Sequence, residues 1–168
     1  LMPSNSLPWP RLHELSGQLV FDRLGMKLSD ASARAGEAKT GMPLSGIQAK
    51  IANMAEQATL EVSAEQKGPA AQVLSLIQKS ALDKLLGSAL HDMQATGAVQ
   101  TRLKLSIPLL ATHNTKVQGA LALNSNDLRA STVLPVFEKA QGTIQFSESG
   151  FSLNAVQARF LGGPIRMQ

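Results

Sequence analysis

The sequence contains no cysteine and no tyrosine, and only one Trp, five Phe and three His among its 168 residues. Without cysteine, the chain can form no disulfide, no thiolate nucleophile and no cysteine metal site. His13, His91 and His113 are far apart, and none lies in a metal-binding spacing such as H-E-x-x-H. The motifs of serine hydrolases, phosphate-binding loops and dinucleotide-binding folds are also missing. The sequence therefore predicts no enzyme, no metal and no cofactor.

Clustered charge of one sign is also lacking, although the formal net charge is +4. The sixteen basic residues are dispersed without a run of three, and residues such as Arg102 and Lys104 fall on the polar side of strand-like patterns. A nucleic-acid surface would need a basic stripe or stacking aromatic side chains. We therefore predict no nucleic-acid partner.

The chain shows no signal peptide and no membrane-spanning segment. It opens with the Pro-rich stretch Leu1–Pro10, and we interpret residues 1–16 as a lead and connector. A hydrophobic content of 43% indicates a folded chain, and its length favours one domain with its own core. We predict a single β-rich domain over residues 17–168, and we expect the chain to be a fragment of a much longer protein.

One pattern occurs twice, 125 residues apart, without a gap. Its first copy contains the residues Gly17, Phe21, Gly25, Leu28, Ala33 and Arg34. Its second copy contains Gly142, Phe146, Gly150, Leu153, Ala158 and Arg159. Apolar and polar residues alternate in both copies, and a glycine falls where a tight turn is needed, so each copy predicts a β-hairpin. We predict an internal repeat at 17–36 and 142–161; the alternative is a pair of ordinary hairpins that follow the same rules.

Alternation of apolar and polar residues predicts further strands elsewhere. These segments are residues 29–35, Ile47–Ile51, Leu60–Ala64, Val99–Leu109, Val117–Leu123 and Leu128–Ser131. Composition predicts a connector at Arg11–Leu15, a loop at Gly36–Gly46 and a turn at Asn124–Asp127. The result is about nine or ten strands, mostly successive and therefore antiparallel neighbours. The predicted fold class is mainly β with a helical insert (α+β), built on a curved antiparallel sheet.

The helical insert covers residues 69–94, where the apolar spacing changes to that of an amphipathic helix. Its apolar positions are Ala70, Val73, Leu74 and Ile77, followed by Leu82, Leu85, Leu86, Ala89, Leu90 and Met93. Ser80 and Asp83 resemble the capping-box start of a second helix, so we predict two short helices, with one kinked helix as the alternative. Ten strands make a sheet about 45 Å wide, and two helices cover roughly half of it. The remaining apolar surface is core, docks a neighbouring segment or holds an apolar ligand.

The repeated sequence motif resembles that of a known protein family. The residues from Leu15 to Leu28 follow the phrase L-x-G-x-L-x-F-x-x-x-G-x-x-L, which is echoed from Gln141 to Gly163 and preceded by Leu7–Pro10. This phrase resembles the AsmA-like proteins of Gram-negative envelopes, and among them the very large YhdP type. The resemblance implies a periplasmic segment of an inner-membrane-anchored protein, whose β units form an apolar groove for phospholipid acyl chains moving between the inner and outer membranes.

The resemblance implies phospholipid or another acyl lipid and neighbouring repeats as partners, with membrane contact through parts outside this segment. No catalytic residues, cofactors or metals belong to the implied site. The expected groove residues are Leu19, Phe21, Met26, Leu28, Leu103, Leu105, Ile107, Leu121, Leu123, Ile144, Phe146, Phe151 and Leu153. Two alternatives remain: a structural or protein-interaction module without a ligand, and a soluble carrier that encloses one ligand.

Overall fold

A computed structural model describes residues 9–37, 39–55, 57–88 and 90–167. Within these ranges the elements are β1 (Leu12–Asp22), β2 (Gly25–Ala35), β3 (Met42–Ile51), β4 (Thr59–Pro69), α1 (Ala70–Gln78), α2 (Ala81–Leu85), β5 (Gln94–Ala95), β6 (Ala98–Pro108), the 3-10 helix η1 (Thr112–Asn114), β7 (Lys116–Arg129), β8 (Phe137–Ser147), β9 (Gly150–Phe160) and β10 (Gly163–Met167). The predicted irregular lead at residues 1–8 and the predicted helix position Ala89 lie outside the described residues.

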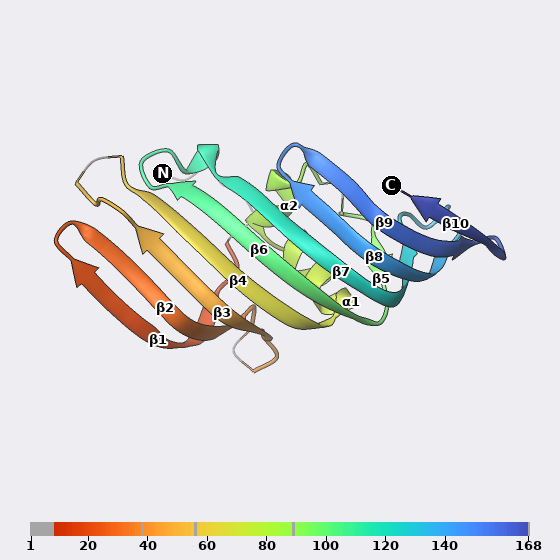
Figure 1. Ribbon diagram of the computed structural model, residues 1–168, viewed down its shortest axis with the longest axis horizontal. Helices are drawn as coiled ribbons and strands as arrows, with labels where there is room; N and C mark the ends of the chain where they lie inside the picture. The colour runs from red at the N-terminus through yellow and green to blue at the C-terminus, as the bar shows by residue number, and fades with distance from the viewer. Residues whose placement is uncertain (1–8, 38, 56, 89, 168) are drawn as a thin grey trace.

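The strands form one open antiparallel sheet in the order β1-β2-β3-β4-β6-β7-β8-β9-β10, and the short β5 pairs with the end of β7. Figure 1 shows the sheet running from β1 at one edge to β10 at the other, with α1 and α2 on the far side. The mainly antiparallel β class with a helical insert is confirmed. The edge strands β1 and β10 do not pair, so the sheet is open. The two helices cover only part of one of its faces (Figure 1).

The hairpins β1–β2 and β8–β9 have the same pairing register. Phe21 pairs with Met26 in the first hairpin, and Phe146 pairs with Phe151 in the second. Both hairpins also carry β-bulges 125 residues apart, marked by left-handed backbone at Glu14, Lys139, Asp30 and Ala155 (φ 54°, 52°, 49° and 51°). Bulges bend a strand and increase its twist. The two ends of the sheet are therefore curved at corresponding positions, whereas the central pair β4–β6 has no register shift.

Two helices form where the sequence predicted two, because Ser80 interrupts them. Its hydroxyl accepts a hydrogen bond from the backbone N–H of Leu82 at 3.3 Å and caps α2. The predicted second helix was too long, since α2 ends at Leu85. Gly87 and Ser88 adopt left-handed backbone (φ 63° and 55°), and Ser88 donates its N–H and hydroxyl to Asp83, so the helix cannot continue.

The predicted turn at Asn124–Asp127 is wrong, because β7 runs through it as a bulge. Asn126 is fully buried, and its side-chain amide donates to the carbonyls of Thr96 and Ala98 at 2.8 and 3.0 Å. Its side-chain oxygen accepts from the N–H of Asn124 at 2.7 Å. A residue type common in turns is used here to fasten the connection between β5 and β6 onto β7.

Two loops are shorter than predicted. β1 begins at Leu12, inside the expected connector, because residues from Leu12 onward pair with the end of β2 at Ala35. β3 begins at Met42, inside the expected loop 36–46, and Pro43 pairs with Arg34. Both differences arise because cross-strand pairing extends past the segments that alternate clearly in the sequence.

Candidate apolar binding face

The thirteen predicted groove residues all lie on the helix-bearing face of the sheet. Residues that pair directly across strands point to the same face, and one such row crosses six strands. This row is Leu19, Leu28, Ala49, Val62, Leu105 and Val117. A neighbouring row joins Ala64, Leu103, Gly119, Phe146 and Phe151, and a third joins Gln66, Thr101, Leu121, Ile144 and Leu153. The other predicted residues, Phe21, Met26, Ile107 and Leu123, lie two positions along from members of these rows.

Exposure along this face changes from one end to the other. Leu19 and Phe21 in β1 are 51% and 62% exposed, whereas Leu123 and Phe146 near the helices are buried. Phe151 is also exposed, and the other eight predicted residues are half-buried. The apolar face is therefore open at the turn end of β1–β2, around Phe21, and covered beneath α1, while Ala31, Ala33 and Ala35 at the other end of β2 are also buried.

Two apolar cavities lie under α1. The first, of about 340 Å³, lies between α1 and the sheet toward β9 and includes Leu121, Ile144, Phe151 and Leu153 in its lining. The second, of about 250 Å³, extends toward β3 and includes Met42, Val62, Leu103, Leu105 and Ile107. Trp9 and Pro10, just before β1, line the second cavity together with residues of both helices.

Four residues line both cavities and so form the boundary between them: Val73, Ile77, Thr101 and Phe146. Phe146 packs over Gly119 of the next strand, and a Cβ atom at Gly119 would overlap its ring. The absence of a side chain at Gly119 therefore lets the Phe146 ring lie flat at the centre of the apolar face.

Two polar residues on this face were not predicted as site residues. Gln66 of β4 and Thr101 of β6 pair directly across the strands and are 3% and 8% exposed. Thr101 lines both cavities, and Gln66 lines the second. The sequence does contain a signal for Gln66, because it continues the alternation of Leu60, Val62 and Ala64 with a polar side chain at an apolar position.

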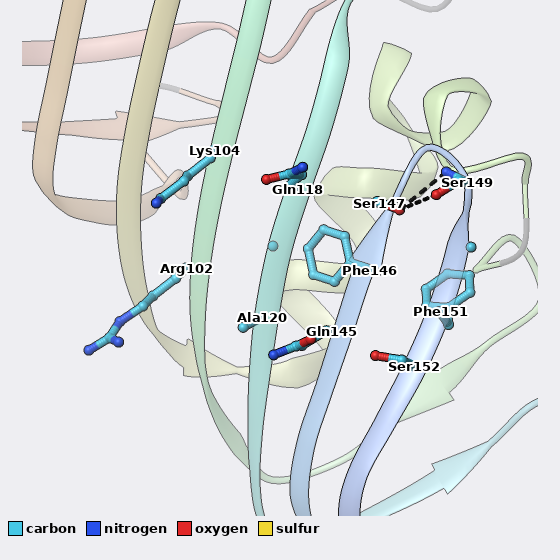
Figure 2. Close-up of a pocket in the computed structure, with 12 residues that line it drawn as sticks. Arg102, Lys104, Gln118, Ala120, Gln145, Phe146, Ser147, Ser149, Phe151 and Ser152 are labelled. Carbon is cyan, nitrogen blue, oxygen red and sulfur yellow. Dashed lines mark hydrogen bonds between the residues drawn. The ribbon is translucent and has the colours of Figure 1, made fainter. Parts of the chain in front are cut away.

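The opposite face is polar. A hollow of about 650 Å³ on this face is lined by side chains that include Arg102, Lys104, Gln118, Gln145 and Ser152 (Figure 2). Arg102 is engaged by Glu65 at 3.1 Å. In the described ranges of the chain, no histidine, aspartate or glutamate lines this hollow. General acid–base catalysis by such a residue therefore finds no group there.

Within the described parts of the chain, no group of three or more His, Cys, Asp or Glu residues is placed to hold a metal ion. None of the helices found there combines the length and the apolar character that crossing a membrane requires. The face that distinguishes this molecule is therefore the apolar one, with its cavities beneath α1.

These features define a class of protein: an open antiparallel sheet whose apolar face is partly roofed by helices and whose other face is polar. Within that class, the chain belongs to the YhdP protein family, whose model matches residues 7–168. It is 26% identical over 159 residues to the intermembrane phospholipid transporter YhdP of Escherichia coli strain K12, which covers 95% of this chain. The match spans 12% of the length of that protein. No solved structure is significantly similar to this chain.

Proposed function

We propose that the apolar face and its two cavities bind the acyl chains of phospholipid, as one section of a path between membranes. The observation that carries this proposal is the unbroken apolar row from Leu19 to Val117, which leads from an open hairpin to the cavities under α1. Family membership and the Escherichia coli relative, an intermembrane phospholipid transporter, support lipid as the ligand. In this proposal the thirteen predicted residues form the contact surface.

The chemistry of the face suits a chain that slides. Burial of each methylene contributes about 0.8 kcal/mol without a preferred direction, so affinity accumulates along the chain with no strong fixed contact. The matched registers and bulges of β1–β2 and β8–β9 support the interpretation that both hairpins are copies of one curved unit. Repetition of such a unit in a longer chain would extend the same apolar face. In the proposal this segment lies in the periplasm, and other parts of the protein contact the membranes.

The test is lipid uptake by the 168-residue protein, measured by native mass spectrometry after incubation with dioleoyl phosphatidylglycerol. Phe21→Asp places a charge on the open part of the face, where its burial under an acyl chain is unfavourable. We expect bound lipid to fall at least about tenfold. Val20→Asp is the matched control, because Val20 is the adjacent exposed residue of β1 and points to the polar face.

Leu105→Asp tests the centre of the row and should stop lipid movement in the longer transporter as well. Equal lipid uptake by wild type, Phe21→Asp and Val20→Asp would contradict the face assignment. No uptake by the wild-type protein would reject lipid binding and favour a structural or interaction module.

A further inference from the structure

The polar pair Gln66–Thr101 is the exception on the apolar face. Both side chains are more than nine-tenths buried, and the described protein offers no hydrogen-bond partner to Gln66 Nε2, Gln66 Oε1 or Thr101 Oγ1. Leaving a buried amide or hydroxyl unpaired is unfavourable by about 1–3 kcal/mol. An apolar residue at either position would avoid this cost, so the pair calls for a partner that the protein does not supply.

The position of the pair points into the proposed lipid path. Thr101 lies at the boundary of the two cavities, opposite Val73 and Ile77 of α1, and Gln66 is its direct partner in β4. Gly68 leaves space for the amide, since a Cβ atom there would lie 2.7 Å from Gln66 Nε2. The backbone is thus shaped to accommodate this side chain beneath the helix.

The charges around the cavities limit what the partner can be. Among the residues that the structure describes, no lysine, arginine or histidine lines either cavity, and the one charged residue in their linings, Glu65, is paired with Arg102. A phosphate or carboxylate would enter this site without a cation, which is strongly unfavourable in an apolar environment. The group that enters this site is therefore a neutral hydrogen-bonding group flanked by apolar chain.

We propose that Gln66 and Thr101 bind the ester carbonyl of an acyl lipid and so hold that lipid at one position along the apolar face. This inference rests on the proposed function. The ester carbonyl oxygen has two lone pairs, so it accepts from both Gln66 Nε2 and the Thr101 hydroxyl, which gives both donors a partner. The pair then discriminates ester-linked lipids from hydrocarbon chains that lack a carbonyl.

The test is competition between two lipids that differ only in that carbonyl. The 168-residue protein is incubated with an equimolar mixture of dioleoyl phosphatidylglycerol and its diether counterpart, and the bound ratio is measured by native mass spectrometry. One neutral hydrogen bond predicts a preference of about three- to tenfold for the ester in wild type. Gln66→Leu should bring the ratio near one, and the exposed polar-face variant Gln118→Leu should keep the wild-type ratio.

Gln66→Leu removes an unpaired buried amide, so its melting temperature should equal or exceed that of wild type. Thr101→Val, which preserves side-chain shape, provides a second variant and should also lower the preference. Equal binding of both lipids by wild type would overturn this inference while leaving acyl-chain binding intact. A preference that persists in Gln66→Leu and Thr101→Val would also overturn it, because other groups of the protein would then recognise the ester. Binding of neither lipid would reject the proposed function and this inference together.

Discussion

The hairpins β1–β2 and β8–β9 share a pairing register and bulge positions, yet they sit in different surroundings. Phe21 is 62% exposed, whereas the residue in the corresponding place, Phe146, is 7% exposed. The difference comes from α1, which lies over Phe146 and has no counterpart over β1 among the described elements. Local sequence thus sets the shape of each hairpin, and the helical insert decides which hairpin is covered.

The largest expected effect is a difference in the free energy of unfolding between alanine variants of the two corresponding phenylalanines, Phe146 and Phe21. Phe146→Ala should lower the free energy of unfolding by about 3–5 kcal/mol, because it empties a packed position between Gly119 and α1. Phe21→Ala should cost less than about 1 kcal/mol, since most of that side chain is already exposed to water. Urea unfolding followed by circular dichroism measures both. Similar losses would mean that the hairpins are covered equally in solution.

A second prediction asks whether α1 stabilises only its own part of the sheet. Ile77→Ala should cost about 2–5 kcal/mol, because Ile77 is buried against the boundary between the cavities. Amide hydrogen exchange should accelerate in β7 and β8 and remain unchanged in β1 and β2. Leu24→Ala, in the exposed β1–β2 turn, serves as the control. Equal acceleration in both hairpins would show that the sheet opens as one unit.

The smallest effect is expected at the open hairpin's surface ion pair. Glu14 and Arg34 lie 3.2 Å apart with exposed side chains, so solvent and salt screen their attraction. Glu14→Ala should change the free energy of unfolding by less than about 0.5 kcal/mol, and the difference should vanish in about 1 M salt. A loss above about 1 kcal/mol would indicate that this edge is more tightly ordered than its exposure suggests.

Alternation and helical spacing predicted much of this molecule because they are local properties. They placed Leu103, Leu105 and Ile107 on one face, and they identified Val73 and Ile77 as the buried side of a helix, as the structure shows. The turn predicted at Asn124–Asp127 failed because composition describes what a residue does with its own backbone. Asn126 instead bonds carbonyls about thirty residues away, which no local pattern reveals.

The candidate site divides in the same way. Its apolar residues were predictable, because every second residue of a strand points to the same face, and pairing in register aligns these residues on neighbouring strands. The pairing of Gln66 with Thr101 was not predictable, since the helical insert separates these residues in the sequence and they meet only when β4 pairs with β6. Their isolation from other polar groups depends on what packs above them, and α1 supplies that cover.

The sequence by itself determined the antiparallel β class, the two short helices, the face to which the regularly alternating strand residues point and the family resemblance. These properties follow from side-chain periodicity, from the positions of glycine and serine, and from a sequence motif repeated along the chain. Only the tertiary structure decided that α1 roofs one end of the apolar face, leaving β1–β2 open and two cavities on either side of Phe146. The physical reason is that burial depends on the placement of distant elements, and a residue's local pattern contains no information about what covers it.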